Sequence, residues 1–351
     1  MKRKEKKSLF AFLCVSFCLG FVFSFALASY SGRAYAKERK GEVTLRLNMN
    51  VPAGAKDVRL WIPYPVSGRY QRIYDVRITG NFTREGIYRE GEHGNIALFA
   101  EWKGQFKKRL LTYSYKVSRR DFVMKDFPKK EMPFSKKEFA RYLRATSLGP
   151  TSGKVKALAL EITKGQSSAV GKARAIYNWI VANMYRDEAV KGCGYGKVER
   201  LITIRGGKCA DISSVFVALA RSAGVPAREI FSIRMPAGKT GDMTESQHCW
   251  AEFHCPGYGW VPVDPADVRK AMLQKKTGNL NDVEGLVKYF FGAVDDNRIV
   301  YYTGRDVLLN PRQRGGRLDY FMYPYAEADG KPLSVDLFGF DLGYKISFKE
   351  L

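Results

Sequence analysis

An apolar helical pattern that starts directly after two glycines constrains this 351-residue chain more than any other feature. The pattern consists of Ile212, Val215, Phe216, Leu219 and Ala220. Apolar side chains at this spacing predict a mostly buried helix, and Gly224 and Pro226 predict its end. Cys209 follows Gly206-Gly207-Lys208 and therefore falls in the first turn of the predicted helix.

A cysteine in the first turn of a helix has special chemistry. Free backbone N–H groups and the positive end of the helix dipole stabilise a thiolate there, and the thiolate is the nucleophilic form. The same N–H groups can hold an oxyanion during acyl transfer. A buried structural cysteine is the simpler alternative, but the glycine-led helix start favours a nucleophile at Cys209.

A predicted β-hairpin supplies a histidine and an aspartate. Residues 247–254 alternate as a strand, residues 256–259 (Pro-Gly-Tyr-Gly) predict a turn, and residues 260–264 return as a second strand. Antiparallel pairing brings His248, near the open end of the first strand, close to Asp264, at the far end of the second. An aspartate that orients an imidazole, which exchanges a proton with a thiol, is the arrangement of a nucleophilic triad.

Four segments resemble the core of the transglutaminase-like superfamily, a branch of the papain-like cysteine enzymes. They are residues 207–211 (Gly-Lys-Cys-Ala-Asp), 223–228 (Ala-Gly-Val-Pro-Ala-Arg), 248–252 (His-Cys-Trp-Ala-Glu) and 258–265 (Tyr-Gly-Trp-Val-Pro-Val-Asp-Pro). The resemblance covers roughly residues 172–268. It implies a catalytic triad of Cys209, His248 and Asp264 that works through an acyl-enzyme. In such enzymes an upstream aromatic or amide side chain helps to bind the oxyanion, and Tyr195 is a candidate for that role.

The predicted fold class is α+β, with the helix bearing Cys209 packed on an antiparallel sheet, as in papain-like and transglutaminase-like cores. Residues 37–125 contain short alternating strands and predict a preceding β-sandwich domain. Residues 126–150 are rich in proline and lysine and predict a connector. Residues 151–351 are predicted to form the core, with the strands beyond Asp264 extending its sheet.

The first 36 residues predict a targeting segment. A basic start is followed by an apolar run over residues 9–28 and by cleavage-like sites at residues 26–28 and 34–36. A cleaved signal peptide is expected, and an uncleaved membrane anchor is the alternative, because the apolar run is near the length that spans a bilayer. The protein is therefore predicted to be exported to the periplasm or the extracellular space.

The charge of the chain bears on its partners. The formal net charge is +24, and removing residues 1–36, with six Lys or Arg and one Glu, lowers it by five to +19. This excess favours attraction to anionic envelope polymers or lipid headgroups, while a solvated basic surface is the simpler alternative. No helix-turn-helix, zinc finger or basic-aromatic motif is found, so nucleic acid is not an expected partner. A protein or peptide substrate is expected instead.

Three further cysteines accompany Cys209 in the mature chain: Cys193, Cys249 and Cys255. The resembling family more often has a small residue at Cys249, and Cys255 is a second departure. Zinc is disfavoured, because Cys249 and Cys255 lie roughly 20 Å apart on an extended strand, too far for zinc–sulfur bonds of about 2.3 Å. The same spacing disfavours a redox pair, and no metal or other cofactor is expected. A disulfide from Cys193 to Cys249 or Cys255 stays open.

These observations predict an exported cysteine enzyme that acts on amide or peptide bonds. Hydrolysis is favoured over transfer to an amine, because water is always available and no amine site can be recognised. The alternative is a non-catalytic envelope module that keeps the fold and binds peptides or cell-wall polymer. An intact set of Cys209, His248 and Asp264 argues against that alternative, since a binding module need not keep all three groups.

Overall fold

A computed structural model of the protein describes residues 38–351. The predicted signal peptide or anchor, residues 1–36, lies outside the described residues. Among the described helices, none is both long enough and apolar enough to cross a membrane.

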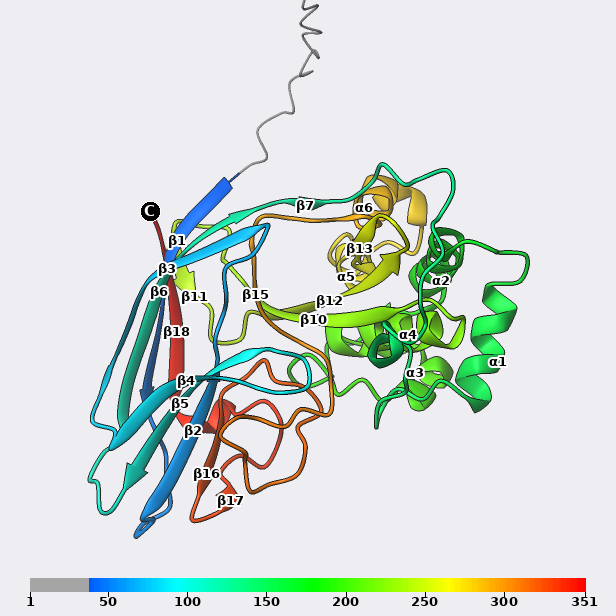
Figure 1. Cartoon of the computed structure of the whole chain (residues 1–351). Helices are drawn as coiled ribbons and strands as arrows, with labels where there is room; N and C mark the ends of the chain where they lie inside the picture. Colours follow the sequence, from blue (N-terminus) through cyan, green and yellow to red (C-terminus); the bar gives the residue numbers. More distant parts are fainter. Residues whose placement is uncertain (1–37) are drawn as a thin grey trace, which may run out of the picture. The chain divides into compact units, whose positions relative to one another are not determined.

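Two five-stranded antiparallel sheets form a β-sandwich (Figure 1). The first sheet has the order β11 (Thr240–Asp242), β18 (Tyr344–Glu350), β1 (Glu38–Asn48), β6 (Leu110–Arg120) and β3 (Gln71–Gly80). The second has the order β17 (Lys331–Pro332), β16 (Tyr325–Ala328), β2 (Asp57–Pro63), β5 (Ile96–Lys103) and β4 (Arg84–Arg89). A small cavity lined by Val43 and Leu45 of the first sheet and Ile62 of the second lies between them, so the two sheets pack face to face.

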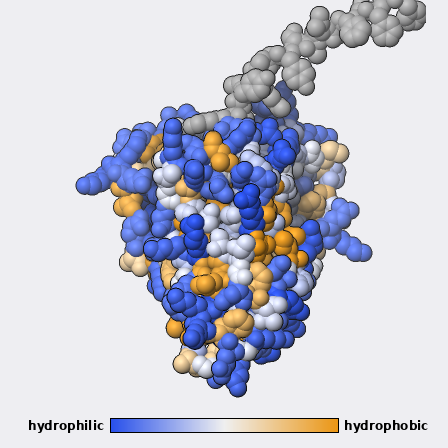
Figure 2. All heavy atoms as spheres, turned by 90° about the vertical axis from the view of Figure 1, so that its left-hand side faces the viewer, coloured by the Kyte–Doolittle hydropathy of each residue, from blue (hydrophilic) through white to orange (hydrophobic). Residues whose placement is uncertain are grey.

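The burial pattern of β1 follows the alternation of its sequence. In β1 the apolar Val43, Leu45 and Leu47 are buried, while the residues between them reach solvent, as expected for a strand with one face in a core. Figure 2 shows the left-hand side of Figure 1, where the sandwich lies. Hydrophilic side chains cover most of this face, and apolar ones form small separate patches.

The C-terminal strands differ from the expectation that the region beyond Asp264 extends the core sheet. Only β15 (Arg298–Thr303) does so, by pairing with β10 (Ala227–Arg234). In contrast, β16 pairs with β2 and β18 pairs with β1. Alternating apolar residues predict a strand but not its partner strand. Here β16 and β18 form hydrogen bonds with the N-terminal strands β2 and β1. A further stretch, residues 318–323, alternates in sequence but forms no strand.

The remaining elements form the core beside the sandwich. Its antiparallel sheet has the order β13 (Gly259–Val263), β12 (Gln247–Cys255), β10 and β15. The α-helices are α1 (Gly153–Ile162), α2 (Ala169–Asn183), α3 (Val198–Ile204), α4 (Cys209–Ser222), α5 (Pro265–Gln274) and α6 (Glu284–Tyr289). The short elements are η1 (Ala140–Tyr142), η2 (Leu280–Val283), η3 (Phe340–Leu342) and the strand pairs β7 (Phe122–Val123) with β14 (Ala293–Val294) and β8 (Tyr185–Arg186) with β9 (Gly206–Gly207).

Helix α4 is the centre of the core. It lies against β10 and β12 and is flanked by α1, α2 and α3 (Figure 1). All its residues from Cys209 to Arg221 are buried. The helix ends where Gly224 adopts a left-handed φ of 81°, with the Val225 N–H donating to Ala220 O at 2.9 Å and the Gly224 N–H to Arg221 O at 3.0 Å. The predicted α+β class, with the cysteine-bearing helix on an antiparallel sheet, is confirmed.

Candidate active site

Cys209 is the first residue of α4, as the sequence predicts. The carboxylate of Asp211 holds this helix start. It accepts the Lys208 N–H at 3.1 Å and the Gly196 N–H at 2.8 Å. Asp211 therefore caps the helix and ties the loop that contains Gly196 to the turn that carries Cys209.

Glycines are required around this carboxylate. A Cβ built on Gly207 would lie 2.5 Å from Asp211 Cβ, and one built on Gly194 would collide with the carboxylate itself. Gly194 also has a φ of 86°, which favours glycine over residues with a side chain. The glycines before α4 thus allow the backbone to pass close to the Asp211 side chain.

His248 and Asp264 come together as the hairpin predicts. Register pairs Ala251 of β12 with Val263 of β13, so Asp264 follows directly after the paired region. The Nε2 atom of His248 lies 2.7 Å from Asp264 Oδ2. The other oxygen, Asp264 Oδ1, accepts the Asp267 N–H at 2.9 Å and caps α5. Because Nε2 faces Asp264, Nδ1 is the ring nitrogen left for Cys209.

Two residues that the sequence analysis did not assign support this pair. Arg298 of β15 is fully buried and donates to Asp264 and, at 2.7 Å, to Asp267 Oδ2. Asp267 Oδ1 lies 3.6 Å from His248 Nε2. The sequence does indicate the position of Asp267 at a helix start, because an acidic residue three positions after a helix cap is typical of a first turn. It gives no such indication for Arg298, since Arg298 lies 34 residues beyond Asp264 in a strand of unknown partner.

These contacts set the charge of the imidazole. Burial and the charge of Arg234 act to lower the pKa of His248, but the carboxylates of Asp267 and Asp264 outweigh them, and the pKa is raised. Burial alone would raise the pKa of Asp267, yet the charges of His248 and Arg298 hold it well below its ordinary value. The site therefore favours an imidazolium at His248 next to an ionised Asp267.

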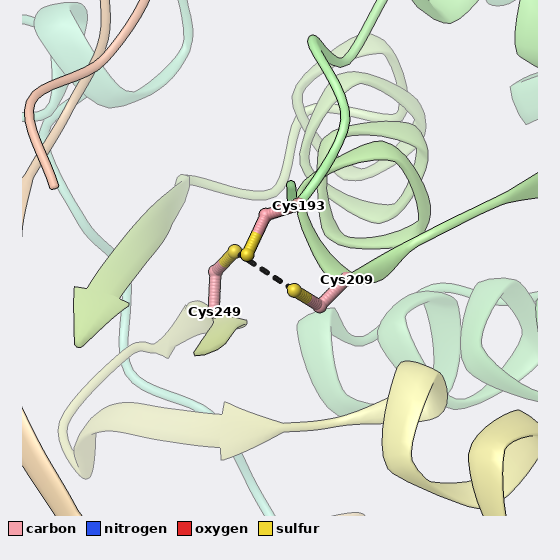
Figure 3. Close-up of side chains that lie close together, drawn as sticks. All are labelled: Cys193, Cys209 and Cys249. Carbon is pink, nitrogen blue, oxygen red and sulfur yellow. Dashed lines mark hydrogen bonds between the residues drawn. The ribbon is translucent and has the colours of Figure 1, made fainter. Parts of the chain in front are cut away.

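Three thiols meet at the start of α4 (Figure 3). Cys249 Sγ lies 3.4 Å from Cys209 Sγ, and the Cys193 sulfur lies within 4.8 Å of both. None of the three cysteines forms a disulfide. The sequence left open a disulfide from Cys193 to Cys249 or Cys255. In the structure Cys193 and Cys249 lie close together without a disulfide bond, and Cys255 lies outside the group.

The pKa of Cys209 is shifted in the opposite direction to the pKa values of Cys193 and Cys249. Hydrogen bonds from Cys193 and Cys249, with a further contribution from His248, hold the pKa of Cys209 well below its ordinary value despite burial. The interaction with Cys209 raises the pKa of Cys193, and burial raises that of Cys249. Cys209 is therefore the thiolate of the group. Burial raises the pKa of Cys255 to about 11.

A cavity of about 280 Å³ opens onto the site and is lined by both Cys209 and His248. Its other charged lining residues are Arg186, Lys208, Arg234, Lys270 and Glu245. Tyr195 is not among the lining residues. Its ring packs 5.3 Å from that of Phe338, and its carbonyl accepts a hydrogen bond from Arg305. The structure therefore gives Tyr195 a packing role and lines the cavity with cationic side chains.

The fold and this cysteine-bearing helix define a class: the chain belongs to the transglutaminase-like superfamily, as its sequence predicts. The family model described as the transglutaminase-like superfamily matches residues 156–265. An uncharacterized protein of Haemophilus influenzae is 37% identical over 321 residues, which cover 84% of this chain and 87% of that protein. The uncharacterized protein YebA of Bacillus subtilis is 26% identical over 195 residues, 50% of this chain and 26% of its own length.

A solved structure shares the fold. It is the crystal structure of a protein from Cytophaga hutchinsonii, provisionally assigned there as a cysteine protease. The match has a TM-score of 0.54 at 14% identity and covers 90% of this chain and 99% of the other. At this identity the match concerns the fold, and it extends over the sandwich as well as the core.

Proposed function

We propose that the protein is an exported cysteine hydrolase that cleaves amide or peptide bonds with Cys209, His248 and Asp264 as its catalytic triad. The observation that carries this proposal is the 2.7 Å hydrogen bond between His248 Nε2 and Asp264 Oδ2, beside a cysteine of lowered pKa. A purely structural buried thiol would have a raised pKa, as Cys255 has. The lowered pKa of Cys209 supports a nucleophile.

In the proposed reaction the Cys209 thiolate attacks the carbonyl carbon of the substrate, and the carbonyl π electrons move to oxygen. The imidazolium of His248 then gives its proton to the leaving amine as the carbon–nitrogen bond breaks. Neutral His248 next takes a proton from water, whose oxygen attacks the acyl carbon. The sulfur leaves as thiolate, and Asp264 holds the ring in one orientation throughout.

The oxyanion needs a donor near the sulfur. The Ala210 N–H donates to Cys193 O at 2.9 Å and is therefore engaged. We assign the oxyanion to the backbone N–H of Cys209 itself, at the positive end of α4. The cationic side chains of Lys208 and Arg186, which line the cavity, add to the positive potential there.

The cavity also bears on the substrate. Four cationic residues line it against one acidic residue, Glu245. This charge favours a substrate with carboxylates near the scissile bond, and the net charge of the chain favours the anionic polymers and headgroups of the cell envelope in the same way. The basic start and apolar run of residues 1–36 support export to that compartment. Water is the proposed acceptor.

The test is a pH series of iodoacetamide alkylation with peptide mapping by mass spectrometry, followed by turnover of acidic fluorogenic peptide amides. Cys209 is expected to label well below the free-thiol pKa of about 8.5, while Cys255 does not. Cys209→Ser should abolish turnover, and His248→Ala should slow both labelling and turnover. Adding a fluorescent primary amine should not divert the product from free acid.

Different outcomes separate the rival functions. Labelling at an ordinary thiol rate that His248→Ala leaves unchanged would overturn the enzyme. Incorporation of the amine in place of hydrolysis would replace the hydrolase with a transferase. Retention of an acidic peptide or polymer by both the wild type and Cys209→Ser, without turnover by either, would indicate a binding module.

A further inference from the structure

Cys193 and Cys249 take no part in the bond-forming steps of the proposed reaction, which use the Cys209 sulfur alone. The three sulfurs come from separate parts of the core: Cys193 from the loop before α3, Cys209 from the start of α4 and Cys249 from β12 (Figure 3). They are at most 4% exposed. Burial of three adjacent thiols at a reactive centre calls for its own explanation.

The separations suit a metal ion. One sulfur–sulfur distance is 3.4 Å, and none of the three exceeds 4.8 Å. Metal–sulfur bonds of about 2.3 Å place the three sulfurs of a planar trigonal site about 4 Å apart. An ion at the centre of the triangle therefore requires only small shifts of Cys193, Cys209 and Cys249.

The chemistry of the ligands selects the ion. Thiolates are soft ligands and prefer soft cations such as Cu(I). Structural zinc takes four ligands, whereas the group formed by the three cysteines contains no fourth His, Cys, Asp or Glu among the described residues. The other buried group of potential ligands comprises His248, Asp264 and Asp267. Arg298 already donates to both of its carboxylates, so that group does not offer a cation site.

The charge around the sulfurs supports the same ion. Three thiolates with one Cu(I) carry a net charge of −2, which requires cationic neighbours. Arg186, Lys208, Arg234 and Lys270 line the cavity onto which Cys193 and Cys209 open. The cavity also gives the ion a route to Cys193 and Cys209, whereas Cys249 is fully buried and does not line the cavity.

We propose that Cys193, Cys209 and Cys249 bind one Cu(I) ion in a trigonal thiolate site, and that the bound ion blocks the nucleophile. Three copper–sulfur bonds form, copper stays in the +1 state, and the protons of the Cys193 and Cys249 thiols pass to solvent. The binding site stands on the geometry of the three sulfurs. Only the block of turnover rests on the proposed hydrolase function.

The test uses the full-length chain, reduced and kept anaerobic, with Cys14 and Cys18 replaced by serine because the N-terminal segment would otherwise compete. Cu(I) is supplied as its bathocuproine disulfonate complex, and transfer to the protein is followed by the loss of chelator colour. One Cu(I) per chain is expected. X-ray absorption of the wild-type site should show three sulfurs at about 2.3 Å, a readout that needs no variant and no activity.

Variants then locate the site. Cys193→Ser and Cys249→Ser should each weaken Cu(I) binding by more than the roughly 10-fold to 100-fold that loss of an outer-shell partner costs. Cys255→Ser removes a buried thiol outside the group and should change nothing. Circular dichroism checks that each variant folds.

Several results would overturn the site: no transfer from the chelator, equal weakening by Cys255→Ser, two sulfurs in place of three, or tighter binding of Zn²⁺ with a fourth ligand. Recovery of a disulfide among the three cysteines from the reduced protein would do so as well. If Cu(I) binds as expected but an active enzyme keeps its turnover, the block fails and the site stands. If Cu(I) binds and no turnover is found without copper, the hydrolase function fails and the site stands.

Discussion

Arg298 and Asp264 form an ion pair in which neither side chain is exposed to solvent. The same carboxylate oxygen of Asp264 accepts from His248 Nε2 at 2.7 Å. Arg298 also donates to Asp267 Oδ2, which in turn accepts from Arg234 at 2.6 Å. The carboxylate that orients the imidazole is therefore fixed and charge-balanced by a residue from the far edge of the core sheet.

Replacing Arg298 by methionine should destabilise the protein strongly. The substitution takes the Arg298 cation away from the buried carboxylates of Asp264 and Asp267, and breaking a buried pair in this way costs about 3–5 kcal/mol. Urea unfolding gives the free energy. The matched control is Arg314→Met, which removes the exposed pair with Asp57 and should cost at most about 1 kcal/mol. Equal losses in the two variants would mean that Arg298 does not neutralise the site.

The contrast between Arg298 and Cys209 explains what the sequence could predict. Cys209, His248 and Asp264 each carry a local signal: a glycine-led helix start, a strand before a tight turn, and an aspartate at the end of the returning strand. Arg298 carries none, because an arginine in an alternating segment usually faces solvent. Its burial depends on the pairing of β15 with β10, which joins segments far apart in the chain.

The same reasoning applies to the sheets. The strands of residues 37–125 are visible as alternation, but the partners of β16 and β18 are not, because pairing with β2 and β1 is set by tertiary packing. The three-cysteine group was missed for a related reason. Distance along one strand excludes Cys255 from joining Cys249, but it says nothing about Cys193 or Cys209, which approach from other elements.

Asp264→Asn should reduce the reactivity of Cys209 without unfolding the core. Asp264 helps to raise the pKa of His248, so its loss lowers the fraction of imidazolium near neutral pH. Cys209 then loses a cationic partner and its pKa rises. A rise of one unit lowers the thiolate fraction below the pKa about tenfold, which iodoacetamide labelling at pH 6.5 measures. Asp75→Asn, an exposed change on the sandwich, should leave the rate unchanged.

Asp267→Asn should flatten the acid limb of the stability curve, which is the range below about pH 5 where the free energy of unfolding falls as the pH falls. The pKa of Asp267 is depressed in the folded protein, so its stabilisation is complete above the unfolded value of about 3.9 and is lost as the pH falls toward the folded pKa. The expected change in slope is at most about 1.4 kcal/mol per pH unit, measured by urea unfolding from pH 5 to 2. Burial raises the pKa of Asp319, so Asp319→Asn should steepen the same limb. Shifts of one sign in both variants would contradict this assignment.

Gly194→Ala should disturb the start of α4 more than a positive φ alone explains. Both Gly194 and Gly165 have a left-handed φ, of 86° and 79°. A Cβ on Gly165 meets nothing within 4 Å, whereas one on Gly194 collides with the Asp211 carboxylate. Gly165→Ala should therefore cost only the left-handed penalty of about 1–2 kcal/mol and leave Cys209 labelling unchanged. Gly194→Ala should cost more and slow that labelling, because Asp211 must then give up its hydrogen bonds to the Lys208 and Gly196 N–H groups, which fix the helix start that carries Cys209.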